Sequence, residues 1–242
     1  MKAILLYVLI GASALALGAL QVADAQDSLQ SEPLLNQKAT PGVGDGPETE
    51  ITAEHEAAVE KGLAWLATQQ NDDGSWTGKI GRKLNNGYDY TRESGHVGVT
   101  SLACIAFLAG GHQPGRGKYG QAIESGLDFV LAACQEDGYV TAGGTRMYSH
   151  AFATLFLAEI FGMTHREDVR LKLQEAVDFI VTCQNEEGGW RYVPLESQSD
   201  MSIVVCQVIA LRAARNIGIR VPKETVDRAS AYVKDSANGM GS

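Results

Sequence analysis

Several polar side chains stand where the long apolar runs of this sequence begin, and they are the residues best placed for chemistry. Asp200 and His96 each precede such a run directly, and Tyr148 and His150 open a third one. A carboxylate or an imidazole beside apolar surroundings can donate or accept a proton, and a phenol can donate a hydrogen bond. These residues are therefore candidates for lining a ligand cavity, and Asp200 is also a candidate catalytic acid.

Each candidate also has a structural interpretation, and the sequence favours it. Asp200 is a suitable N-cap, because a carboxylate at that position accepts from the free amides of the first helical turn. His150 lies on an apolar segment, where a hydrogen-bonded core histidine is more common than a ligand-binding one. Glu93 lies three residues before His96, so these two side chains form either an acid–base pair or two solvated loop residues.

A repeated pattern must position these candidates. Four aromatic residues each have a small residue three positions earlier and a glycine nine positions later. The aromatic residues are Trp65, Phe129, Phe179 and Tyr232, the small ones are Gly62, Gly126, Ala176 and Ala229, and the glycines are Gly74, Gly138, Gly188 and Gly241. On an amphipathic helix the ring would lie on the apolar stripe, and the small residue one turn earlier would let another helix approach closely. The glycine then ends the helix in a left-handed turn.

Tryptophans follow two of these glycines. Trp76 comes two residues after Gly74, and Trp190 two residues after Gly188. A large ring just beyond a tight turn is expected to fold back onto the end of the helix and to set the direction in which the chain leaves. We therefore interpret both tryptophans as structural. The acidic pairs of the same turns are interpreted as solvated turn residues: Asp72-Asp73 and Glu186-Glu187.

A second class of segment alternates with the first. The runs Val97–Ala109, Tyr148–Phe161 and Met201–Ala214 are almost wholly apolar, whereas the repeat helices carry charges. A helix that is apolar all round is surrounded by other helices, so we expect the apolar runs to be inner helices and the repeat helices to be outer ones. Thr100, His150 and Ser202 are set as equivalent inner positions. The first outer helix is expected over about 53–70, followed by a loop over Thr77–Gly95.

Two segments of the repeat resemble a known motif. Gln70-Asn-Asp-Asp-Gly-Ser-Trp76 and Gln184-Asn-Glu-Glu-Gly-Gly-Trp190 resemble the QW motif of the terpene cyclase and protein prenyltransferase superfamily, which includes squalene cyclase-like proteins and the prenyltransferase and squalene oxidase repeats. The resemblance covers about 53–242. It implies an all-α fold, the α/α toroid, in which inner helices ring an apolar cavity and outer helices wrap them. Cys134 replaces the glutamine in the second copy and the fourth copy ends at Gly241, so we expect an incomplete toroid of about three and a half hairpins.

The catalytic residues of that superfamily do not match as well as its fold. Squalene–hopene cyclases protonate their substrate with an Asp-x-Asp-Asp motif, of which Asp200-Met-Ser-Ile203 keeps one carboxylate. Protein prenyltransferases hold zinc with an Asp-x-Cys pair and a histidine. Thr145-Arg-Met147 stands in place of the pair, and Ile203 in place of the histidine. The resemblance therefore implies no zinc site here.

The cysteines give no metal-binding pattern either. Cys104, Cys134, Cys183 and Cys206 contain no C-x-x-C pair, so we predict no metal and no cofactor. All of them lie in apolar helical runs or at helix ends. We expect buried free thiols, and the alternative is a disulfide between Cys134 and Cys183.

The N-terminal part of the chain differs from the rest. Residues 1–25 combine Lys2, an apolar run to about Val22 and an Ala23-Asp24-Ala25 sequence, which is typical of a secretory signal peptide with its cleavage site. The alternative is an uncleaved membrane anchor. Residues 26–52 are expected to be a flexible linker, and residues 53–242 the repeat domain. The formal net charge of -9 without a basic stripe excludes nucleic acid as a favoured partner.

These observations lead to two functional hypotheses. The first is an exported, periplasmic or extracellular repeat protein without catalytic activity, whose concave apolar face binds a lipid or an isoprenoid, or packs on a partner chain. The second is a terpene cyclase or prenyltransferase-like enzyme whose catalytic residues lie beyond a truncated C-terminus. In either case contact with a membrane would be made only through the N-terminal segment.

Overall fold

The structure, a computed structural model, describes residues 51–84 and 87–238. The predicted signal peptide, almost all of the predicted linker, and Gly241 lie outside the described residues. Within the described residues, none of the helices combines the length and the apolar character that crossing a bilayer requires.

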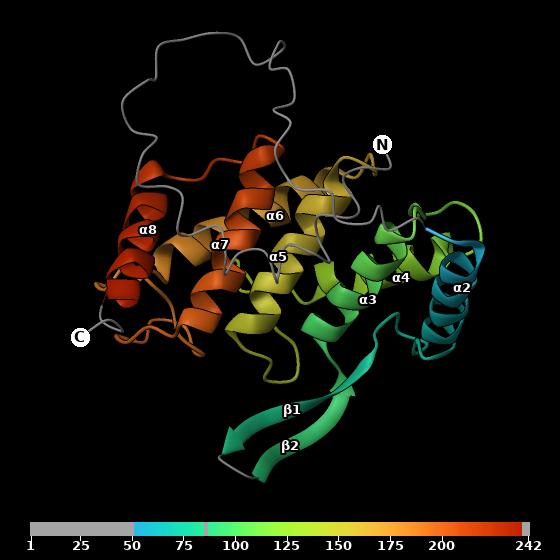
Figure 1. Ribbon diagram of the computed structural model, residues 1–242, viewed down its shortest axis with the longest axis horizontal. Helices are drawn as coiled ribbons and strands as arrows, with labels where there is room; N and C mark the ends of the chain where they lie inside the picture. Colours follow the sequence, from blue (N-terminus) through green and yellow to red (C-terminus); the bar gives the residue numbers. More distant parts are fainter. Residues whose placement is uncertain (1–50, 85–86, 239–242) are drawn as a thin grey trace, which may run out of the picture. The chain divides into compact units, whose positions relative to one another are not determined.

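Helices make up most of the described chain (Figure 1). In chain order the elements are α2 (Ala53–Thr68), β1 (Thr77–Leu84), β2 (Gly87–Gly95), α3 (Val97–Ala109), α4 (Gly120–Ala132), α5 (Met147–Phe161), α6 (Glu167–Thr182), α7 (Met201–Asn216) and α8 (Lys223–Asn238). The all-α fold predicted from the sequence is confirmed, with one small two-stranded sheet added to it.

The helices alternate between two layers, as the sequence predicts. The apolar helices α3, α5 and α7 lie side by side, with α5 packed between the other two (Figure 1). The helix that follows each of them in the chain packs onto it: α4 onto α3, α6 onto α5, and α8 onto α7. The buried core lies between these inner and outer helices and includes Phe107, Phe156 and Leu173.

Turn glycines set the distance between successive outer helices. Gly74, Gly138 and Gly188 have φ values of 83°, 89° and 86°, so each takes the left-handed conformation that ends a helix. A Cβ atom at these positions would meet a carbonyl oxygen of the next outer helix: that of Ser125 at 2.2 Å, of Glu175 at 2.3 Å and of Arg228 at 2.4 Å. Each of these carbonyls belongs to the residue directly before a small residue of the repeat. Glycine is therefore required for both its φ and its missing side chain.

The tryptophans fold back as predicted. The Trp76 Nε1 donates a 2.8 Å hydrogen bond to the Leu66 carbonyl, and the Trp190 Nε1 donates one of 2.8 Å to the Ile180 carbonyl. Both rings are buried. Each indole therefore donates to a carbonyl in the last turn of its own outer helix, and the Leu66 carbonyl also accepts from the Gln69 amide at 3.1 Å.

The glutamines of the motif join the turn to the next outer helix. The Gln184 Nε2 donates to the Gly188 carbonyl at 2.8 Å and to the Thr225 carbonyl at 2.9 Å. Gln70 makes the same pair of bonds, to the carbonyls of Gly74 and Ala122. In the second copy the turn is held differently, because Cys134 lacks the side-chain amide of the glutamine that it replaces. There the Tyr139 ring stacks on Phe179 with 4.7 Å between ring centroids.

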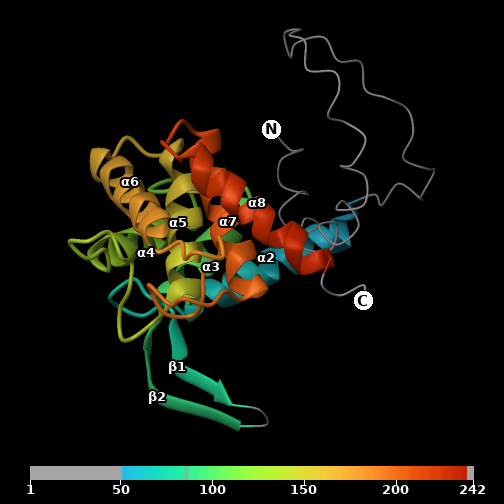
Figure 2. The same cartoon turned by 90° about the vertical axis from the view of Figure 1, so that its left-hand side faces the viewer.

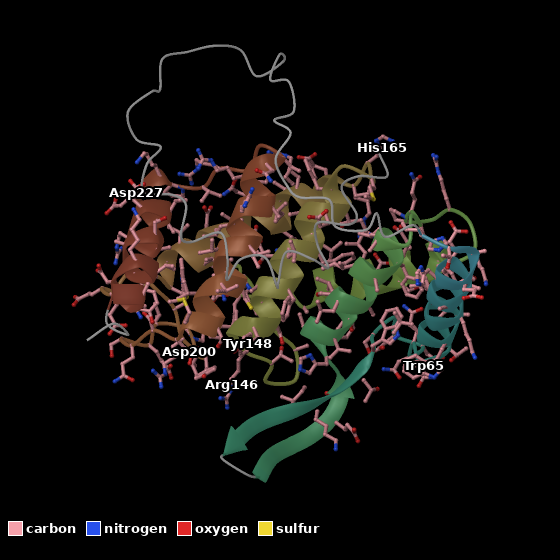
Figure 3. All side chains as sticks on the ribbon, viewed as in Figure 1. Trp65, Arg146, Tyr148, His165, Asp200 and Asp227 are labelled. Carbon is pink, nitrogen blue, oxygen red and sulfur yellow. The ribbon has the colours of Figure 1, made fainter. Side chains whose placement is uncertain are left out.

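The first copy of the repeat departs from the prediction. Trp65 was expected on the apolar stripe, but it is 63% exposed and lies on the surface of α2 (Figure 3). Gly62 was expected at a close helix contact, but nothing lies within 4 Å of a Cβ placed there. In later copies both positions pack on the turn that follows the preceding outer helix, as Phe179 does on Tyr139. Within the described residues no outer helix and turn come before α2. Trp65 and Gly62 therefore have no turn to pack on.

The loop predicted over Thr77–Gly95 is a β-hairpin that projects from the helical layers (Figure 2). Its strands are antiparallel, with Thr77 opposite Gly95 and Lys79 opposite Glu93, and the register shifts between Ile80 and Gly81. The polar composition of this segment led to the wrong prediction. The Asn-Gly sequence at 86–87 is a hairpin signal that could have corrected it.

One inner-helix equivalence also changes. The amides of Thr100, His150 and Val204 each donate to the carbonyl of the N-cap residue four positions earlier. Val204, not Ser202, is therefore the third equivalent position. The sequence could have given the right position, because Asp200 was already interpreted as the N-cap and the equivalent position lies four residues after it.

The cysteines are free thiols, as expected. Cys104 and Cys183 are buried, whereas Cys134 and Cys206 are half-buried. Burial raises the pKa of both Cys134 and Cys183 to about 11, so these thiols stay protonated and unreactive near neutral pH. The alternative Cys134–Cys183 disulfide does not form in this structure.

Replacing Gly138 by alanine should destabilise the fold more than the same change at Gly111. Both glycines have a positive φ, 89° and 86°, but only at Gly138 would the methyl group meet a backbone oxygen. We expect the free energy of unfolding in urea to fall by about 1 kcal/mol for Gly111→Ala and by about 3 kcal/mol for Gly138→Ala. Equal losses would show that the close approach is not a constraint.

Candidate functional site

Asp200 is held by hydrogen bonds at the start of α7. Its Oδ1 accepts from the Ser202 amide at 2.9 Å and from the Ser202 hydroxyl, and its Oδ2 accepts from the Tyr192 hydroxyl at 2.7 Å. The carboxylate is thus the N-cap of α7. These bonds use both of its oxygens.

The surroundings of Asp200 oppose a role as proton donor. Hydrogen bonds from Ser202, and then from Tyr192, lower the pKa of the Asp200 carboxyl below its ordinary value. The same contact raises the pKa of Tyr192. A general acid must carry a proton at the working pH, and this arrangement favours the ionised carboxylate instead.

Two tyrosines lie beside Asp200. The Tyr148 and Ser202 hydroxyl oxygens are 2.5 Å apart, and the rings of Tyr148 and Tyr192 are 6.1 Å apart between centroids. Figure 3 shows Tyr148 at the same end of the inner helices as Asp200, with Arg146 nearby. The structure therefore brings together two of the predicted site residues, Tyr148 and Asp200. Tyr192 was not identified from the sequence, because it lies in a loop without a repeated pattern.

His150 is fully buried and fully engaged. Its Nδ1 accepts from the Val140 amide at 3.0 Å, and its Nε2 lies 3.2 Å from the Ala176 carbonyl oxygen, to which it donates. Burial lowers the pKa of His150 to about 4, so the imidazole is neutral near pH 7. This histidine joins the turn after α4 to α6 and does not reach the surface.

His96 is an N-cap rather than one member of an acid–base pair. Its Nδ1 accepts from the Val99 amide at 3.3 Å at the start of α3. Burial lowers the pKa of His96. Glu93 lies on β2, opposite Lys79 in the strand register, and is exposed.

The inner helices leave one stripe uncovered. On α5, four residues recur every three or four positions, so they share one side of the helix, and all remain at least partly exposed. The equivalent positions of α3 and α7 are exposed or half-buried too, except Gly98, which is buried and is left out of the set. We call this set the inner face: Leu102, Ile105 and Ala109 of α3; Tyr148, Phe152, Leu155 and Glu159 of α5; and Ser202, Cys206, Ile209 and Ala213 of α7. It is apolar apart from Glu159 and the hydroxyl groups of Tyr148 and Ser202.

A second side of α7 is exposed but does not belong to the inner face. Three positions that are buried on α5 are exposed at their equivalents on α7. The pairs are Ala151 and Val205, Thr154 and Val208, and Ala158 and Arg212. These positions are buried on α5, the helix against which α7 packs. On α7 the equivalent positions have no such neighbour among the described helices, so they are exposed. Val208 is therefore exposed for a different reason from Ile209, its neighbour on the inner face.

Glu159 is a site residue that was not identified from the sequence. It lies in the last turn of α5, on the same stripe as Tyr148, Phe152 and Leu155. Burial raises the pKa of its carboxyl group. An acid within an otherwise apolar run was the available signal, and it was overlooked because the run was expected to be buried on all sides.

Two surface hollows lie elsewhere. One, of about 610 Å³, is lined by Glu187, Arg191, Tyr232 and Asp235 among others. A second, of about 350 Å³, lies beside Asp178 and Leu195. Both are next to the turns and the outer helices, and none of the predicted cavity residues lines either one.

The described residues offer no ready metal site. In the part of the chain that the structure covers, no three His, Cys, Asp or Glu side chains come close enough to share an ion. The polar groups near Asp200 are instead satisfied by one another.

The sequence comparison with known proteins agrees with the repeat. The chain is 24% identical over 153 residues to a squalene–hopene cyclase of Zymomonas mobilis subsp. mobilis. The predicted resemblance to the terpene cyclase superfamily is confirmed. The match covers 59% of this chain but only 22% of the cyclase, so the chain spans less than a quarter of that enzyme. No protein-family model matches the chain.

A solved structure with some similarity is the type II terpene cyclase MstE from Scytonema, determined in complex with geranylgeranyl dihydroxybenzoate. The TM-score is 0.46 and the sequence identity 14%, over 75% of this chain and 49% of that one. Neither comparison transfers an activity to this chain.

The pH dependence of stability should report on His150. The unfolded chain binds a proton at this imidazole below about pH 6.5, whereas the folded chain resists it until about pH 4. Unfolding is therefore favoured as the pH falls between these values, and the free energy of unfolding should decrease by up to about 1.4 kcal/mol per pH unit. His150→Thr, which places there the residue found at Thr100, should flatten this dependence. His165→Thr, at an exposed histidine, should leave it unchanged; if both variants behave alike, His150 is not the responsible group.

Proposed function

We propose that this chain is an exported binding module without catalytic activity, whose inner face holds an apolar ligand such as a lipid or an isoprenoid. The uncovered apolar surface of α3, α5 and α7 carries the proposal. Leu102 and Ile209 are 44% and 38% exposed although they lie within helices that otherwise pack in the core. Neighbouring exposed apolar residues of this kind mark a binding surface, because leaving them in water is unfavourable.

The chemistry at Asp200 supports the non-catalytic part of the proposal. A cyclase needs a protonated acid to attack an alkene, but the pKa of Asp200 is lowered and its oxygens already accept hydrogen bonds. A hydrogen-bonded polar cluster lies at one end of the inner face and has a structural role. It consists of Asp200, Ser202, Tyr148 and Tyr192. Export is proposed from the N-terminal sequence alone.

The alternative function is that of a terpene cyclase-like enzyme, and the match to squalene–hopene cyclase favours it. Incubation of the purified chain with squalene separates the two. We expect no cyclised product, since the candidate acid is ionised. A product that disappears in Asp200→Asn would establish catalysis at this residue and refute the proposal.

A charge on the inner face should abolish ligand binding. We expect Ile209→Glu to weaken the binding of farnesol, measured by isothermal titration calorimetry, by at least about tenfold, because the carboxylate would be desolvated by the ligand. Val208→Glu is the matched control, since Val208 is equally exposed at 37% but lies off the inner face. Loss of binding in both variants, or in neither, would contradict the assignment of the ligand to this face.

A further inference from the structure

Glu159 is the one acidic side chain of the inner face. The equivalent positions of the neighbouring inner helices are Ala109 and Ala213, so packing does not require a long side chain here. Within the described residues, neither a basic side chain nor a hydrogen-bond donor pairs with its carboxylate. By contrast, Tyr148 at the other end of the stripe is engaged with Ser202.

The position of Glu159 is unfavourable for the isolated protein. It lies in the last turn of α5, which ends at Phe161, where the unpaired carbonyl groups already concentrate negative charge. The side chain is exposed overall, yet partial desolvation by the apolar stripe still raises the pKa of its carboxyl group. An exposed carboxylate without a partner, placed at the end of an otherwise apolar stripe, is a candidate group for binding a cation.

We propose that the ligand of the inner face is an amphiphile with a cationic amine end group, and that Glu159 binds this group. The inference rests on the proposed function, whose ligand class it narrows. A cation next to Glu159 pairs with its carboxylate and offsets the negative charge at the end of α5. The alternative of a neutral or acidic end group leaves the carboxylate unpaired or repelled.

The stripe also sets the length of the ligand. Tyr148 and Glu159 are eleven residues apart on α5, which corresponds to about 16 Å along the helix axis. The apolar body of the ligand would lie over Phe152 and Leu155 between them. A chain of farnesyl length is of the right size to span this distance, with its amine at Glu159.

Binding of three farnesyl compounds to the full chain tests the inference. Farnesylamine, farnesol and farnesoic acid share one apolar body and differ only in the end group. We expect farnesylamine to bind about fivefold more tightly than farnesol, and farnesoic acid to bind more weakly than farnesol. Glu159→Gln should make the amine and the alcohol bind equally while leaving farnesol affinity unchanged. Glu136→Gln, at an exposed turn residue off the inner face, should retain the preference.

The outcomes separate this inference from the proposed function. If farnesol and farnesylamine both fail to bind the wild-type chain, the proposed function fails. If farnesol binds but the amine binds no more tightly, or if Glu159→Gln keeps the preference for the amine, the role of Glu159 is refuted while the apolar site stands. Circular dichroism of Glu159→Gln, expected to match that of the wild type, verifies that the variant is folded.

Discussion

The close approach of a turn glycine to the next outer helix is the contact on which this arrangement depends. At Gly74, Gly138 and Gly188 the backbone lies so near a helix carbonyl that a methyl group would not fit. The contact is made between backbone atoms, so its distance does not vary with the side chains of each copy. Successive outer helices are therefore held at one spacing, and the inner helices that they cover are held at the same spacing.

Buried polar groups connect these turns to the inner helices. The Trp76 amide donates to the Thr100 hydroxyl at 2.9 Å, and in the next copy the Val140 amide donates to the His150 Nδ1 at 3.0 Å. His150 then reaches Ala176 on the following outer helix. A single buried side chain thus joins a turn, an inner helix and an outer helix. This explains why an imidazole that looks reactive in the sequence is used for structure: its two nitrogens are both occupied, and burial keeps it neutral.

The layered packing also decides which residues remain available to a ligand. Because the turns and the outer helices cover one side of α3, α5 and α7, the opposite side stays open. A helix side that faces water usually carries polar residues, whereas this side carries Leu102, Phe152 and Ile209. Apolar stripes on both sides of a helix are consistent with a second apolar partner beyond the protein core. The two ends of this surface differ: among the described residues the Glu159 carboxylate at one end has no partner, whereas the Tyr148 and Ser202 hydroxyl groups at the other end bond to each other.

The sequence by itself determined the features that depend on local chemistry. The bounds Val97–Ala109 of α3, the left-handed conformation of Gly74, Gly138 and Gly188, and the return of Trp76 onto its own helix follow from residues close together in the chain. Spacing and residue type are sufficient for these, because the atoms that meet are separated by few bonds.

Only the tertiary structure decided which repeated residues are covered and which are open. Trp65 and Phe179 occupy the same place in the repeat, yet Trp65 is exposed because the described chain has no earlier turn on which its ring could pack. Likewise Val208, Ile209 and Glu159 lie on helices that the sequence shows only as apolar runs. Whether such a side chain faces a neighbouring helix or solvent depends on segments far away in the chain, and burial is a property of that packing rather than of the residue.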